Sequence, residues 1–81
     1  MKFTKEDINS YFITLIEDEQ KVPASEVDVH AEFYTFGLDS ISSIYLLDKL
    51  EDYLGIKLNP IDFFDYPTID KFSSYLIDQK L

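Results

Sequence analysis

Apolar residues recur with a helical period from residue 8 onward. They follow the i, i+3, i+4, i+7, i+8 spacing that places side chains on one face of a helix. These residues are Ile8, Tyr11, Phe12, Leu15 and Ile16. Thr4, with Asp7 three residues on, is a variant of the capping box that begins a helix. The pattern predicts a first helix that opens at Thr4 and ends at or before Pro23.

A second amphipathic helix is predicted from Asp39 or Ser40 to Leu54. Asp39 is a favourable N-cap, and Gly55 stands where a left-handed residue ends a helix. At 100° per residue, one stripe gathers the residues that we expect to be buried. They are Leu46, Leu47, Leu50, Tyr53 and Leu54.

The outer face of this second helix is also apolar in part. It carries Ile41, Ile44, Tyr45, Asp48, Glu51 and Asp52. A helix that is buried on one side does not need isoleucines on the other, so this face is interpreted as a contact surface for a partner. The alternative is that the preceding connection covers it.

Two shorter helical segments follow. Asn59-Pro60 is typical of a cap followed by proline at the first helical position, and Pro67 stops this short third helix. Its apolar residues are Ile61, Phe63 and Phe64. Thr68 then caps a fourth helix. Its apolar positions are Ile69, Phe72, Tyr75 and Leu76.

Residues 21 to about 38 follow neither the helical nor the strand period, yet they are too apolar for a loose loop. The apolar positions are Val22, Val27, Val29, Phe33, Phe36 and Leu38. We expect a long connection that is pinned to the core at several points, with a short helical turn. The predicted fold is a single all-α domain over residues 1–81, a four-helix bundle with a short third helix and a long connection between helices one and two.

Charge narrows the class of partner. The chain has sixteen acids against seven lysines, a formal net charge of −9, and no cysteine. Such a protein would repel nucleic acid and anionic membranes, and it favours partners with basic patches. Acids appear within the first seven residues and no apolar run is long enough to span a membrane, so we expect a cytoplasmic protein. We also expect a monomer.

The stretch "FGLDSIS" combines a turn with a helix start. Gly37 allows a sharp turn and leaves space for another protein to approach. Ser40 lies at the helix start, where unpaired N–H groups and a partial positive charge tolerate an added phosphate. Asp39 can cap the helix or help bind a divalent cation that a modifying enzyme brings. From these residues alone, an unmodified helical interaction module, with Ser40 as a simple helix-start residue, stays open.

"FGLDSIS", followed by an amphipathic helix, resembles the phosphopantetheine attachment site of acyl and peptidyl carrier proteins. The downstream segment "LGIKLNPIDFFDYPTIDKFSSYL" resembles carrier domains of polyketide and non-ribosomal peptide synthases. The resemblance extends from the first helix to the last, and the two elements occur in the family's order.

The resemblance implies that Ser40 receives a 4′-phosphopantetheine arm from coenzyme A, within a site that includes Gly37, Leu38 and Asp39. Asp39 would assist the magnesium site of the phosphopantetheinyl transferase. The arm's thiol would hold an acyl or aminoacyl group as a thioester. The second helix would dock the transferase and the acyl-loading and acyl-processing enzymes through their basic and apolar patches. The chain itself would not be an enzyme.

Two positions depart from the family's pattern. Many carriers have Leu where this chain has Ile41, and many have Glu where it has Tyr45, which bears on the choice of docking partner. The "FGLDS" form differs from the Gly-Gly-His/Asp-Ser form common in peptide synthases. It therefore favours an acyl carrier of a polyketide-type or hybrid pathway, with a peptidyl or aminoacyl carrier as the alternative.

The residues give little support to catalysis or to a metal site. "GLDSI" is not the Gly-x-Ser-x-Gly elbow of a hydrolase, and His30, the only histidine, lies in the long connection. Residues 26–32 are acidic but lack the glycine and terminal glutamate of a calcium-binding EF-hand loop. We therefore predict neither catalytic residues nor metal ligands.

Overall fold

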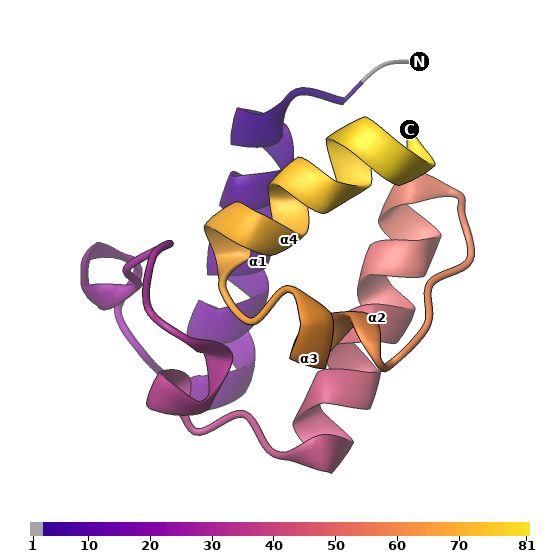
Figure 1. The fold of residues 1–81 in the computed structure, drawn as a ribbon. Coiled ribbons are helices and arrows are strands. Elements are labelled where there is room, and N and C mark those ends of the chain that lie inside the picture. The colour runs from indigo at the N-terminus through magenta and orange to yellow at the C-terminus, as the bar shows by residue number, and fades with distance from the viewer. Residues whose placement is uncertain (1–2) are drawn as a thin grey trace.

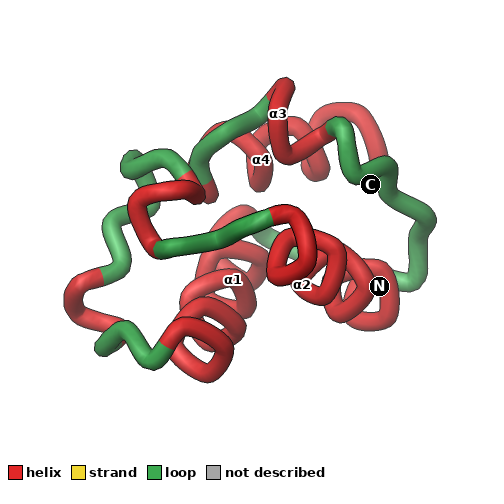
Figure 2. Tube along the Cα trace, turned by 90° about the horizontal axis from the view of Figure 1, so that it is seen from below, coloured by secondary structure: helices red, strands yellow, loops and turns green. Residues whose placement is uncertain are grey.

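The computed structural model describes residues 3–81, which form four α-helices in two layers (Figure 1). The helices are α1, Lys5–Gln20; α2, Ser40–Leu54; α3, Asp62–Asp65; and α4, Ile69–Tyr75. Figure 2 shows α1 and α2 side by side, with α3 and α4 together on one side of that pair. The predicted all-α bundle with a short third helix is confirmed.

The predicted helix ends are confirmed at three of the four helices. Thr4 Oγ1 accepts from the Asp7 N–H at 3.1 Å and Asp7 accepts from the Thr4 N–H at 2.9 Å, a complete capping box at α1. Thr68 Oγ1 accepts from the Lys71 N–H at 3.1 Å and begins α4. Gly55, at φ +70°, ends α2 in the left-handed conformation that glycine favours.

The core lies between the two layers and is rich in phenylalanine. Phe12 of α1 meets Phe72 of α4 edge to face, with ring centroids 5.4 Å apart. The completely buried apolar residues are Ile8, Phe12, Ile16, Leu46, Leu50, Ile69, Phe72 and Leu76. Side chains from α1, α2 and α4 thus share one core, and no helix buries its apolar face alone.

The connection between α1 and α2 is long but attached to the core, as predicted. It contains two 3₁₀ turns, Ala24–Glu26 and Phe33–Phe36. Val27, Phe33 and Phe36 are buried, and Val22, Val29 and Leu38 pack partly against the core. Outside the helices, residues 3–81 pair as strands only at one isolated bridge, between Glu32 and Thr68.

The predicted start of the third helix is wrong by two residues. Residues 59–61 form a tight turn before α3: the Asp62 N–H donates to the Asn59 carbonyl at 2.9 Å, and the Phe63 N–H donates to the Pro60 carbonyl at 3.2 Å. These are i to i+3 bonds, so Pro60 begins a turn and Asp62 is the first helical residue.

Tyr53 is a second correction, because its side chain is 37% exposed and does not belong to the buried stripe of α2. It lies at the edge of that stripe, where its ring stacks on Tyr11 of α1 with centroids 4.0 Å apart. Tyr11 is itself half-buried. The two rings close the outer edge of the α1–α2 contact and leave the centre to Leu46 and Leu50.

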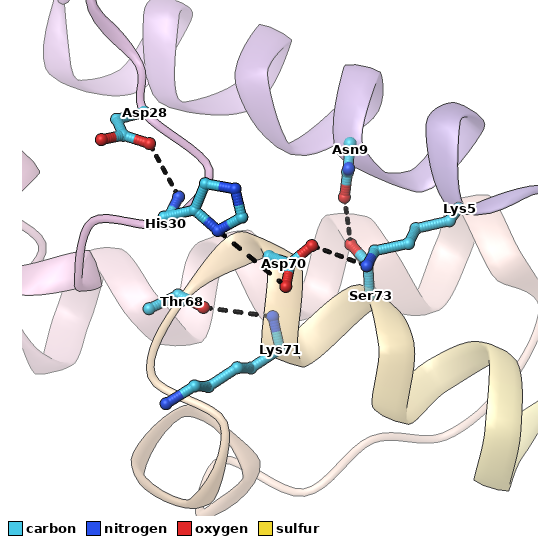
Figure 3. A network of polar contacts seen from close by, with 8 residues as sticks. All are labelled: Lys5, Asn9, Asp28, His30, Thr68, Asp70, Lys71 and Ser73. Carbon is cyan, nitrogen blue, oxygen red and sulfur yellow. Dashed lines mark hydrogen bonds and ion pairs between the residues drawn. The ribbon is translucent and has the colours of Figure 1, made fainter.

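Polar contacts tie α1, α4 and the connection together (Figure 3). Lys5 Nζ lies 2.6 Å from an Asp70 carboxylate oxygen, and His30 Nδ1 lies 4.0 Å from the other. Ser73 Oγ donates to Asn9 Oδ1 at 2.5 Å. The hydrogen bond from Lys5 lowers the pKa of the Asp70 carboxyl below its ordinary 3.8. These side chains of α1, α4 and the connection are therefore paired with one another.

Among residues 3–81, no helix combines the length and the apolar content that crossing a bilayer requires.

Candidate functional site: the start of α2

Ser40 is the first residue of α2, and its position is defined by the cap that precedes it. Asp39 has an extended backbone at φ −98°, and its Oδ1 accepts from the Ser42 N–H at 2.8 Å. That bond lowers the pKa of the Asp39 carboxyl below its ordinary 3.8, so the group is ionised at neutral pH. Asp39 and Ser40 are both exposed. The result is an accessible hydroxyl beside a carboxylate at a helix N-terminus.

The turn before this cap depends on Gly37. Its φ is +79°, in the left-handed region, and its N–H donates to the Tyr34 carbonyl at 2.9 Å. Gly37 thus ends the Phe33–Phe36 turn and redirects the chain toward α2. Leu38, which follows, is half-buried. The sequence placed these residues in one turn-and-cap unit, and the structure has them in that arrangement.

An open cleft of about 620 Å³ begins beside Ser40. It runs between α2, α3 and the end of the connection. Its walls are mainly apolar and include Tyr34, Leu38, Ile44, Phe63 and Phe64. An extended group attached to Ser40 would therefore have an apolar surface next to its attachment point. The hydroxyl provides an attachment atom and the cleft provides an apolar surface, and together they fit a phosphate-linked arm that has an apolar portion.

The outer face of α2 is exposed, and the connection does not cover its large side chains. Ile41 is 80% exposed, Ile44 57% and Tyr45 44%. Asp48 and Asp52 are exposed on the same helix. The alternative in which the connection buries this face is therefore wrong for residues 41, 44 and 45.

Glu51 differs from the other predicted partner-binding residues, because it has a partner within the chain. Its Oε2 accepts from the Leu58 N–H at 2.7 Å, and the residue is half-buried. This bond holds the segment after α2 against the helix. A shallow groove then runs between α2 and Leu58-Pro60, with Ile41, Ile44 and Tyr45 along one wall.

The sequence pattern missed the exposed aromatic residues across the cleft. Phe64 of α3 is 80% exposed and Tyr34 is 71% exposed, whereas Phe63 is buried. Phe63 and Phe64 are adjacent in a helix of four residues, which is too short for a helical wheel to distinguish them. The paired Phe-Phe signal was visible, but its division into one buried and one exposed ring was not.

Of the histidine and the acids in residues 26–32, only Glu32 lines the Ser40 cleft. His30 belongs to the contacts around Asp70 and is absent from the residues that line the Ser40 cleft. Within residues 3–81, no group of three or more His, Asp or Glu side chains is arranged to hold a metal ion.

The arrangement defines a class of protein: a small helical bundle that presents one serine at a helix start, beside an apolar cleft and an exposed helix face. The family of the phosphopantetheine attachment site matches residues 10–76. The chain belongs to this family.

Relatives agree with the match. The chain is 32% identical to the polyketide synthase PksL of Bacillus subtilis over 69 residues, which is 85% of this chain and 2% of that protein. The chain thus spans only a small fraction of the synthase. It is 31% identical to a free-standing peptidyl carrier protein of Acinetobacter baumannii, with a TM-score of 0.87, covering 95% of this chain and 96% of the other.

A second solved structure is equally similar. The acyl carrier protein Asl1650 of Anabaena sp. PCC 7120 is 33% identical, with a TM-score of 0.88, and 96% of this chain and 89% of that chain are covered. Its reported feature is a variant phosphopantetheinylation-site sequence. The chain is therefore a carrier domain of this family, whose domains are non-catalytic and whose cofactor is covalent 4′-phosphopantetheine.

Proposed function

We propose that Ser40 is the residue that carries the 4′-phosphopantetheine arm. The observation that carries this proposal is the exposed Ser40 residue at the first position of α2, at the edge of the apolar cleft. In the loading reaction the serine oxygen bonds to the phosphorus of the arm. The bond to the adenosine bisphosphate of coenzyme A breaks, and the serine proton is released. Once attached, the arm supplies a thiol that holds cargo as a thioester.

The neighbouring residues have separate roles in this proposal. Asp39 caps α2 through Oδ1 and presents an ionised carboxylate to the magnesium ion that the transferase brings. Gly37 provides the turn at a φ of +79°, and a Cβ atom at this position would lie 3.1 Å from Gln20 Nε2. Leu38 forms part of the cleft wall beside the attachment point.

The outer face of α2 is proposed to be the docking surface for partner enzymes. We define this docking surface as Ile41, Ile44, Tyr45, Asp48, Glu51 and Asp52. Exposed isoleucines flanked by carboxylates suit a partner with an apolar centre and a basic rim. The partners are a phosphopantetheinyl transferase and the enzymes that load and process the cargo. Glu51 contributes mainly by holding the groove wall at Leu58.

The pathway is proposed to be of the polyketide type or a hybrid, which is supported by the similarity to PksL. The similarity to a peptidyl carrier protein supports the alternative, an aminoacyl or peptidyl cargo. We further propose one carrier domain over residues 1–81, since Ile8 and Leu76 share one core. We also propose that this domain acts as a monomer. A cytoplasmic location belongs to the same proposal, because loading consumes coenzyme A.

The first test is the intact mass of the chain after incubation with coenzyme A, Mg²⁺ and a broad-specificity phosphopantetheinyl transferase. We expect one phosphopantetheine on the parent, none on Ser40→Ala, and one on Ser25→Ala, a control that removes another exposed serine. A gain of mass by Ser40→Ala would move the attachment to a different residue. No gain by the folded parent would favour an unmodified helical interaction module.

A further inference from the structure

The side chain of Gln20 reaches the connection just before the Gly37–Ser40 turn. Gln20 is the last residue of α1, and its Nε2 donates to the Phe36 carbonyl oxygen at 2.9 Å. A Cβ atom on Gly37 would lie 3.1 Å from the same Nε2. The Gln20 amide is therefore packed against the peptide bond that joins Phe36 to Gly37.

Hydrogen bonds hold this peptide bond at both edges. The Phe36 carbonyl accepts from Gln20, and the Gly37 N–H donates to the Tyr34 carbonyl at 2.9 Å. The carbonyl and the N–H belong to one planar unit, so the two bonds together determine its orientation. Glycine restrains its own φ weakly. The +79° at Gly37 therefore depends on these contacts.

Gln20, which provides the donor, belongs to a helix that is packed into the core. Phe12 and Ile16 of α1 are fully buried, and α1 stops directly after Gln20 because Lys21 adopts a left-handed φ of 57°. Figure 1 shows the end of α1 beside the part of the connection that leads into α2. The Phe36 ring is itself buried in the core. The buried ring fixes the location of Phe36, and the hydrogen bond from Gln20 fixes the orientation of its carbonyl group.

We propose that Gln20 is a positioning residue for the modification of Ser40. It fixes the Phe36–Gly37 peptide and thereby the direction in which the chain enters the Asp39 cap. This inference rests on the proposed attachment at Ser40. Without the donor, the peptide samples further orientations, and only a fraction of the molecules presents Ser40 correctly. The apparent affinity for the transferase falls by that fraction, so KM for the carrier rises while kcat stays unchanged.

The test compares transferase kinetics and amide exchange for three substitutions. Gln20→Met removes the donor without adding charge, Gln20→Glu removes it and adds a negative charge, and Gln20→Lys keeps a donor with a positive charge. A net attraction between the acidic carrier and a basic transferase would lower KM for the Glu variant and raise it for the Lys variant. If the hydrogen bond matters instead, KM should be higher for the Glu variant, which lacks the donor, than for the Lys variant, which keeps it. The two variants therefore distinguish an effect of charge from an effect of positioning.

We expect KM to rise about five-fold for Gln20→Met and Gln20→Glu, the size of one net hydrogen bond. KM for Gln20→Lys should stay close to that of the parent, and kcat should not change. The Gly37 amide should exchange faster in the Met and Glu variants. Gln79→Met, at an exposed position, is the matched control. Ser73→Ala removes the contact to Asn9 and measures what a general loss of stability does to KM.

Three results would overturn the positioning role of Gln20. Parent-like KM values and Gly37 exchange in all Gln20 variants would overturn the positioning role while leaving the attachment at Ser40 intact. A KM increase that Ser73→Ala reproduces at equal loss of Tm would also overturn it, since stability alone would explain the effect. A folded parent that takes up no phosphopantetheine would overturn the proposed function itself, and this inference with it.

Discussion

The α1–α4 side and the α2–α3 side of the molecule use their side chains differently. On the α1–α4 side, Asn9 and Ser73 bond to each other and Lys5 pairs with Asp70, so polar groups meet within the chain (Figure 3). On the α2–α3 side, Ile41 and Phe64 are each 80% exposed. Both sides contain apolar and acidic residues, but the most exposed large apolar side chains lie on the α2–α3 side.

The difference separates the residues that hold the fold from the residues that remain available to partners. Exposed apolar groups stabilise nothing in the free chain and become favourable only when another surface covers them. Their concentration around Ser40, and not around α4, is therefore a property of the site. The comparison makes three predictions, which follow in order of expected effect.

Phe72 and Phe64 allow the comparison to be tested with one kind of substitution. Phe72→Ala removes a fully buried ring and should lower the free energy of unfolding by about 3–5 kcal/mol. That is a large share of the roughly 5–15 kcal/mol typical of a domain. Phe64→Ala removes an exposed ring and should change it by less than about 0.5 kcal/mol. Urea denaturation followed by circular dichroism measures both; similar losses would remove the distinction between the two sides.

Ile44→Asp sharpens the comparison at the docking surface. We expect kcat/KM for loading and for transfer to a partner enzyme to fall about ten-fold, because a charge would enter the apolar centre of the contact. Tyr45→Ala should act in the same direction, and the helical spectrum of both variants should stay that of the parent. Thr14→Asp, on the exposed face of α1, adds the same charge elsewhere and should have no effect. Unchanged rates for Ile44→Asp and Tyr45→Ala would contradict the assignment of this surface.

Asp70→Asn should have the smallest effect and a defined pH dependence. The Lys5 hydrogen bond lowers the pKa of Asp70 in the folded chain, with His30 and Lys71 adding to the lowering. The ionised group therefore stabilises the fold above the unfolded pKa of about 3.8, and this contribution disappears as pH falls through the lower folded value.

Thermal unfolding from pH 7 to pH 2 provides the measurement. The parent should have a slightly higher Tm than Asp70→Asn at neutral pH, since pairs near the surface contribute little. The difference should shrink as pH falls below 3.8. Asp18→Asn, an exposed acid on α1, is the control. A difference that grew as pH fell below 3.8 would contradict the assigned sign.

Much of the fold was predictable because the signals are local. The capping box at Thr4, the Asp39 cap and the left-handed Gly55 each depend on residues within a single turn, and all three are present. The two faces of α2 were also predictable, since fifteen residues are enough for a helical period to distinguish them. The position of Ser40 at a helix start was predictable for the same reason, because its turn, cap and helix are contiguous. Its proposed modification came from the resemblance to carrier proteins and not from these local signals.

Other features required contacts between distant parts of the chain. The exposure of Phe64 depends on how α3 meets the rest of the bundle, and the exposure of Tyr53 depends on its stacking against Tyr11. The Glu51 contact to Leu58 gives a surface carboxylate a structural task that the wheel did not indicate.

The sequence by itself determined the existence of the four helices, the caps of α1, α2 and α4, and the serine at the start of α2, because short-range hydrogen bonds and side-chain periodicity act within a few residues. Only the tertiary structure decided which apolar side chains remain exposed, where the cleft opens, and that Gln20 reaches Phe36 across sixteen positions of sequence. The physical reason is that burial and long-range hydrogen bonds depend on the packing of whole helices, which no local pattern specifies.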